Sequence, residues 1–307
     1  MFGRWSSRRS SAWSGLVGMA VALLAVVGCA GGTPATSSSG VLEVVAAENF
    51  WGSIVSQIGG KHVHVTSIIA SPDADPHDYE PTPNDAKTIA RARYVVVNGA
   101  GYDPWASKLV DSNPASGRQT LTIADLFGKK DGDNPHLWYS PDYVGQFIER
   151  VTGDLKKMDS ANAADYDQQS AQYKTQGLKG YHDAIAAIKQ KYSGTPVGAS
   201  ESIFAYLSPA LGLDLITPPA YLKAVTEGTD ISPADKATVQ QQIAGKQIKV
   251  FVFNSQNSTP DVQQAVDQAR AKGIPVTQIT ETLTPATATF QDWQTKQLQD
   301  LLGALGG

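Results

Sequence analysis

The stretch "DYDQQSAQYKTQGLKGYHDAIAAIKQKY", Asp165 to Tyr192, decides how this chain is organised. It contains no proline and is rich in Ala, Gln and Lys. Its apolar side chains recur at spacings near three, four or seven, which predicts one long amphipathic helix over 165–192. Gly177 and Gly180 weaken this helix, because glycine has a low helix propensity. The recurring apolar residues are Tyr166, Tyr173, Tyr181, Ile185, Ile188 and Tyr192.

Short apolar runs alternate with longer amphipathic segments on both sides of this helix. Such alternation is typical of β–α units with parallel strands. We therefore predict an α/β fold with two lobes, over 41–164 and 193–307. Each lobe has a mostly parallel four-stranded sheet flanked by helices, and the long rigid helix joins them. The strands are predicted at Val41–Ala47, Val63–Ala70, Tyr94–Gly99, Gln119–Ala124, Pro196–Ala199, Leu213–Thr217, Ile248–Asn254 and Ile274–Thr280.

A recurrent signature marks four helix starts. In each, Ser or Thr can cap the helix, Pro can take its first position, and Asp follows within the first turn. These segments predict helix starts at Thr82, Ser140, Ser232 and Thr259.

The N-terminal segment is typical of a bacterial export signal. Three arginines precede the apolar run "LVGMAVALLAVV", Leu16 to Val27, which is too short to span a membrane. The sequence "VVGCA" follows and is similar to a lipobox, in which Cys29 would be lipidated. We predict a signal peptide over 1–28 and a flexible lipidated tether over 29–40. The arginine pattern leaves Sec and twin-arginine export both open.

The composition narrows the function classes. The formal net charge of −4 offers no basic footprint for nucleic acid, so no nucleic-acid partner is expected. Cys29 is the only cysteine, so we expect neither a disulfide nor a thiolate ligand in the mature protein. The remaining chain suits an extracytoplasmic receptor or enzyme held at the cell membrane by a lipid anchor, and composition does not separate the two.

Two of the five histidines lie in similar loops, "DPHDYEPTP" around His77 and "NPHLWYSP" around His136. In both loops Pro precedes His directly and another Pro follows soon after. Proline restricts its own backbone and that of the preceding residue, so both loops should be stiff. Each loop follows a predicted strand. A histidine that merely closes a turn explains one such loop, but two favour a shared site.

The second lobe supplies carboxylates in the same topological position. Glu201 follows the fifth predicted strand in "PVGASES", and Glu281 follows the eighth in "PVTQITET". Ligand sites in open α/β sheets lie at the carboxyl ends of strands, so a cleft between the lobes could collect all four side chains. Singly, Glu201 could be a first-turn helix acid and Glu281 an ordinary loop residue.

Two imidazoles and two carboxylates without a thiolate favour a divalent first-row ion such as Mn²⁺, Zn²⁺ or Fe²⁺. Bidentate carboxylates would raise the coordination number and favour Mn²⁺, whereas intrinsic affinity favours Zn²⁺. Asn254 and Gln256, in "FNSQNSTP", are candidates for orienting the ligands, with loop capping as the alternative.

These motifs resemble the metal-binding solute receptors of zinc and manganese ABC importers, the TroA-like superfamily. "DPHDYEPTP" and "NPHLWYSP" carry most of the resemblance, with "SESIFAYL" and "TETL" in the same order. It implies two lobes joined by one long helix, with an ion between them. Carried over residue by residue, the metal ligands are His77, His136, Glu201 and Glu281. Glu at the third position is similar to the manganese-type receptors, and Glu281 stands where Asp is frequent.

The resemblance implies an extracytoplasmic monomeric lipoprotein, not an enzyme, that carries Mn²⁺ or Zn²⁺ as cargo to an ABC permease and needs no catalytic cofactor. A metal-dependent hydrolase is the first alternative. It would need an open coordination position and a general base, and no HExxH motif is present. A surface adhesin is the second alternative, without repeats to support it.

Overall fold

The computed structural model describes residues 40–72 and 79–307. It contains two four-stranded parallel sheets with strand orders β2-β1-β3-β4 and β6-β5-β7-β8. The predicted α/β class and all eight predicted strands are thereby confirmed. The strands are β1 Leu42–Glu48, β2 Val63–Ile69, β3 Tyr94–Val97, β4 Gln119–Thr122, β5 Pro196–Ala199, β6 Asp214–Leu215, β7 Phe251–Asn254 and β8 Val276–Ile279.

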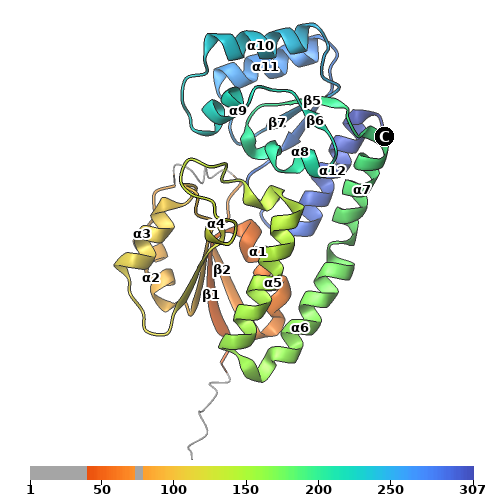
Figure 1. Ribbon diagram of the computed structural model, residues 1–307. Helices are drawn as coiled ribbons and strands as arrows, with labels where there is room; N and C mark the ends of the chain where they lie inside the picture. Colours follow the sequence, from red (N-terminus) through yellow and green to blue (C-terminus); the bar gives the residue numbers. More distant parts are fainter. Residues whose placement is uncertain (1–39, 73–78) are drawn as a thin grey trace, which may run out of the picture. The chain divides into compact units, whose positions relative to one another are not determined.

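Helices flank both sheets (Figure 1). In the first lobe they are α1 Asn49–Gly59, α2 Pro83–Arg91, α3 Pro104–Ser112, α4 Ile123–Leu126 and α5 Pro141–Met158, with short 3₁₀ turns η1 Gly60–His62, η2 Leu137–Tyr139 and η3 Ser160–Asn162. In the second lobe they are η5 Ser202–Ala205, α8 Leu207–Ala210, α9 Pro219–Thr226, α10 Pro233–Ala244, α11 Pro260–Ala271 and α12 Phe290–Leu305. No helix in residues 40–72 and 79–307 is both long and apolar enough to cross a bilayer.

Side chains on β1 alternate between the two faces of the first sheet. Val44 and Ala46 belong to the main hydrophobic core, which also contains buried residues of α1 and α5. Val45 and Ala47 belong to a smaller core with residues of α2 and α3. Because a parallel sheet is covered on both faces, its central strands are apolar over Val44–Ala47 and Tyr94–Val97 rather than alternating with polar residues.

Four helices begin at the predicted capping residues. The hydroxyl oxygens of Thr82, Ser140, Ser232 and Thr259 each accept a backbone N–H from the first turn of α2, α5, α10 and α11, respectively. Proline occupies the first turn of each helix, as the signature predicts.

The linking segment is helical but is not the single regular helix that the sequence predicts. It consists of α6 Ala163–Gln172, a π-helical stretch Tyr173–Gly177 (η4) and α7 Lys179–Tyr192. A Cβ at Gly177 would lie 2.7 Å from Cδ2 of Tyr173, so the buried Tyr173 ring can only lie there over a glycine. The wider turn is closed by the bond from Leu178 N–H to Tyr173 O, five residues earlier.

The linking segment contacts both lobes. In the first lobe α6 packs against α5 and α1, and in the second α7 lies along α12 (Figure 1). The main hydrophobic core also contains residues of both lobes, so the lobes share buried apolar surface. The domain boundaries given above remain predictions.

Glu48, at the end of β1, is a fully buried carboxyl group. Its carboxyl group shares a hydrogen bond with the side chain of Asp103. Burial raises the pKa of Glu48 well above its ordinary value of 4.5, and the nearby Asp103 carboxylate raises it further. Asp103 also accepts backbone N–H bonds from Asn98 and Gly99, at 2.7 Å each.

We expect Glu48→Gln to stabilise the protein at neutral pH but not at pH 4. A raised pKa in the folded state favours folding below the unfolded value of 4.5, and this contribution is lost as the pH rises. The melting-temperature difference between variant and parent should therefore grow from pH 4 to pH 7. The exposed Glu80→Gln variant is the control. An equal difference at both pH values would contradict a protonated Glu48.

Candidate metal centre

Three predicted ligand residues converge. His136, Glu201 and Glu281 each offer one ligand atom, and these atoms all lie within 4.8 Å of one another. Nε2 of His136 is 3.8 Å from Oε1 of Glu201. The three side chains are 0–2 % exposed. His136 follows α4, Glu201 follows β5 and Glu281 follows β8, so the cluster forms where the two lobes meet at the carboxyl ends of their strands.

Asn254, the last residue of β7, connects the two carboxylates. Its Nδ2 donates to Oε1 of Glu201 at 2.8 Å and to Oε1 of Glu281 at 2.9 Å. The side-chain oxygen Oδ1 of Asn254 accepts the backbone N–H of Gln256. This bond fixes the orientation of the Asn254 side chain. One buried amide group thus holds together two acidic side chains that would otherwise repel each other.

The other oxygen of each carboxylate has its own donor. Asn257 Nδ2 donates to Oε2 of Glu201 at 2.8 Å, and the Tyr102 hydroxyl donates to Oε2 of Glu281 at 2.9 Å. A carboxylate has about four lone-pair sites, so these bonds orient both groups without exhausting their capacity as ligands. The Tyr102 bond also joins the first lobe to the second.

Asn134 orients the imidazole of His136. Its Oδ1 accepts the backbone N–H of His136 at 3.1 Å and lies 2.8 Å from Nδ1 of the ring. Because an amide oxygen can only accept, Nδ1 must carry the proton in this contact. In the neutral imidazole, a proton on Nδ1 leaves Nε2, which faces Glu201, as the nitrogen that can bind a metal ion.

Gln256 supports the loop that carries Glu281 rather than touching a ligand side chain. Its Oε1 accepts the backbone N–H groups of Glu281 and Thr282, at 2.6 and 3.0 Å. Its Nε2 also donates to Pro72 O in the first lobe. Gln256 therefore positions Glu281 through the backbone.

An aromatic cluster backs the site. The Trp138 and Tyr102 rings lie 5.3 and 6.0 Å from the His136 ring, and Trp138 stacks on Phe50 at 3.9 Å. All are fully buried. Apolar surroundings of this kind strengthen electrostatic interactions within the site.

Two predicted site residues, His77 and Cys29, lie outside the described residues. Their roles as a ligand and as the lipidated residue remain predictions. Sequence reasoning overlooked three others, Tyr102, Asn134 and Asn257. Asn134 stands two residues before His136, and Asn257 lies in the same "FNSQNSTP" segment as Asn254. Their closeness in sequence to predicted site residues could have identified both.

A family model for zinc-uptake complex component A, periplasmic, matches residues 44–304. The chain belongs to this family. The match covers both lobes and the linking segment, and the predicted resemblance to metal solute receptors is confirmed.

Curated relatives of this zinc-uptake family member have manganese in their names. The chain is 29 % identical over 206 residues to the manganese-binding lipoprotein MntA of Halalkalibacterium halodurans, covering 64 % of this chain and 67 % of the relative. It is 26 % identical over 263 residues to the manganese ABC transporter substrate-binding lipoprotein PsaA of Streptococcus mitis, covering 78 % and 81 %.

Solved structures share the fold of this family member. The Mn-bound periplasmic metal binding protein of Candidatus Liberibacter asiaticus superposes with a TM-score of 0.72 at 22 % identity, covering 86 % of this chain and 99 % of that chain. The substrate-binding protein FpvC of Pseudomonas aeruginosa, in complex with Mn²⁺, superposes with a TM-score of 0.67 at 21 % identity, covering 86 % and 98 %.

Proposed function

We propose that this chain is an extracytoplasmic lipoprotein that binds one Mn²⁺ or Zn²⁺ ion between its lobes and delivers it to the permease of an ABC importer. The observation that carries the proposal is the buried cluster of one imidazole and two carboxylates, with ligand atoms within 4.8 Å of one another. The metal-binding names of the relatives support it.

The donor set suits a divalent cation. Two carboxylates balance the charge of the ion, and the imidazole nitrogen suits first-row metals. We propose His77 as the fourth ligand on the strength of the sequence resemblance alone. The protein acts by binding and release and performs no chemistry on the ion, which is its cargo.

Metal titration tests the proposal. We expect metal-depleted protein to bind one equivalent of Mn²⁺ or Zn²⁺ and to melt several degrees higher when loaded. A ligand at a hundred times its dissociation constant stabilises the folded state by about 2.7 kcal/mol. For a chain of this size that corresponds to a rise of about 4–5 °C in melting temperature.

His64→Ala is the matched control for adventitious binding by histidine. His64 is exposed and pairs with Glu43 on the first sheet, away from the site, so this variant should bind like the parent. If neither ion binds to the parent, the proposed function is wrong. Tight Mn²⁺ binding alongside Zn²⁺ indicates manganese import, and Zn²⁺ binding alone indicates zinc import.

A further inference from the structure

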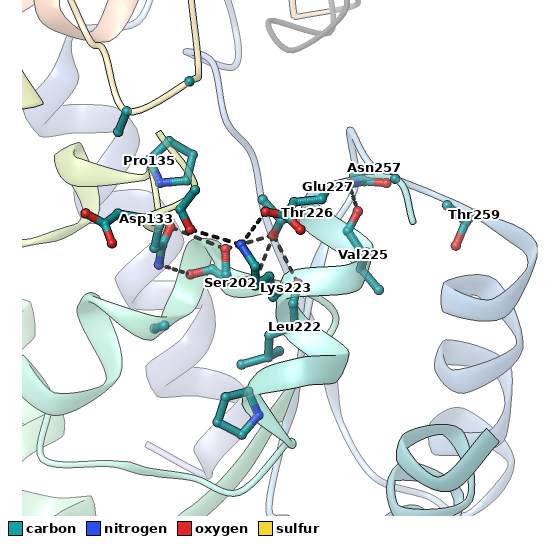
Figure 2. Close-up of a pocket in the computed structure, with 17 residues that line it drawn as sticks. Asp133, Pro135, Ser202, Leu222, Lys223, Val225, Thr226, Glu227, Asn257 and Thr259 are labelled. Atoms are coloured by element: carbon teal, nitrogen blue, oxygen red, sulfur yellow. Dashed lines mark hydrogen bonds and ion pairs between the residues drawn. The ribbon is translucent and has the colours of Figure 1, made fainter. Parts of the chain in front are cut away.

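The ligand side chains are almost fully buried, so an ion must cross a layer of protein to reach them. A cavity of about 690 Å³ lies beside the cluster, with walls from both lobes (Figure 2). The first lobe contributes the segment 133–135, just before His136, and the second contributes Ser202, residues of α9 and Asn257. Water occupies about 30 Å³ per molecule in the liquid, so the cavity has room for a hydrated ion.

Three residues belong both to the cavity wall and to the site. Asn134 contacts Nδ1 of His136 at 2.8 Å, and Ser202 Oγ lies 3.4 Å from the same atom. Asn257 donates to Oε2 of Glu201 at 2.8 Å. All three are half-buried, whereas the ligands they contact are buried. A single layer of polar side chains therefore separates the cavity from the cluster.

The chemistry of this wall suits a cation that exchanges water for protein ligands. Ser202 Oγ and Thr226 Oγ1, 2.8 Å apart, place hydroxyl oxygens on the wall. Asp133 and Glu227 add two carboxylates, against one lysine, Lys223, which pairs with Glu227. On the aromatic side, by contrast, Trp138, Phe50 and Tyr102 offer packed rings.

We propose that this cavity is the access route of the ion, and that the side chain of Asn257 is its inner gate. The inference rests on the proposed function and adds the path by which the ion enters and leaves. Asn257 is held by two bonds, one to Glu201 Oε2 and one to Val225 O at 3.2 Å. Figure 2 shows the second of these bonds. When its side chain turns away from these acceptors, Glu201 is exposed to the cavity.

Exchange kinetics of Zn²⁺ test the route. Ala205 lines the cavity, and its methyl side chain cannot hydrogen-bond to a ligand residue. Ala205→Phe fills part of the space. We expect association and release to slow together, each by about tenfold, with an unchanged dissociation constant, because a higher barrier acts equally in both directions. Tryptophan fluorescence, to which Trp138 beside His136 contributes, follows binding of Zn²⁺. The same signal follows release after excess chelator is added.

Ala210→Phe is the matched control, since Ala210 is equally half-buried in the same lobe but does not line the cavity. It should exchange at the parent's rates. If Ala205→Phe also exchanges at those rates, the route is wrong, although stoichiometric Zn²⁺ binding by the parent would leave the proposed function intact. Failure of the parent to bind would instead overturn the function.

Asn257→Ala tests whether the Asn257 side chain is the gate. It also tests the access route if Ala205→Phe does not fold. Removing a gate should accelerate association as well as release. Loss of a purely positioning residue would accelerate release and weaken affinity while association stays at the parent's rate, and that result would overturn the proposal.

Discussion

The double variant Glu201→Gln, Glu281→Gln is expected to bind no Mn²⁺ or Zn²⁺ at concentrations that saturate the parent. Loss of a residue that merely supports a ligand costs about 10–100-fold in affinity, so loss of two charged ligands should cost more. Gln preserves the shape of Glu, and the ligand atoms of the two carboxylates lie within 4.8 Å of each other. Both oxygens of Glu201 accept bonds from amide N–H groups, of Asn254 and Asn257, so the NH₂ of a Gln faces a donor there, and we expect the metal-free variant to fold but to melt below the parent.

Isothermal titration and melting curves with and without metal measure both effects. Glu149→Gln, on the exposed surface of α5, is the control and should match the parent in both. Retention of tight binding by the double variant would show that the ion binds elsewhere.

Asn254→Leu is expected to destabilise the metal-free protein by about 3 kcal/mol, because hydrogen bonds to charged groups contribute about 1.5–3 kcal/mol each. The variant loses both bonds from Nδ2, to Glu201 and to Glu281, while the two carboxylates keep their negative charges side by side. A bound cation neutralises them, so metal should raise the melting temperature of this variant more than that of the parent.

Calorimetry with and without Mn²⁺ measures this difference. Asn84→Leu on the exposed side of α2 is the control for the substitution itself. Equal stability of Asn254→Leu and the parent without metal would mean that the carboxylates do not depend on this amide.

The strands and the helix starts were predictable because they depend on residues that are close together in the sequence. Strands such as β3 are short buried apolar runs, and Thr82 and Ser140 cap helices through contacts within a single turn. The π-helical stretch was not predictable, because it depends on where the Tyr173 ring packs. Gly177 and Gly180 suggested only a weaker helix.

The part of the site that depends on strand topology was predictable. Glu201 and Glu281 come shortly after β5 and β8, and His136 lies in the segment that follows β4 and α4, so strand topology could place all three at the carboxyl ends of the sheets. The Tyr102 bond to Glu281 depends instead on how the lobes pack, and the loop sequence "NGAGYDPW" gives no sign of it. Glu48 was overlooked for a similar reason, since its burial results from the elements that cover it.

The strand order is the same in both sheets, and the clustered ligand residues come from both lobes. Neither half of the chain therefore contains a complete binding site. Glu281 follows the last strand, so a polypeptide that is still folding has no cluster until β8 is in place. A chain cut short before Glu281 also lacks one of the three clustered side chains. Under the proposed function, metal capture thus reports that the molecule is complete, and truncated copies cannot withdraw scarce ions from intact ones.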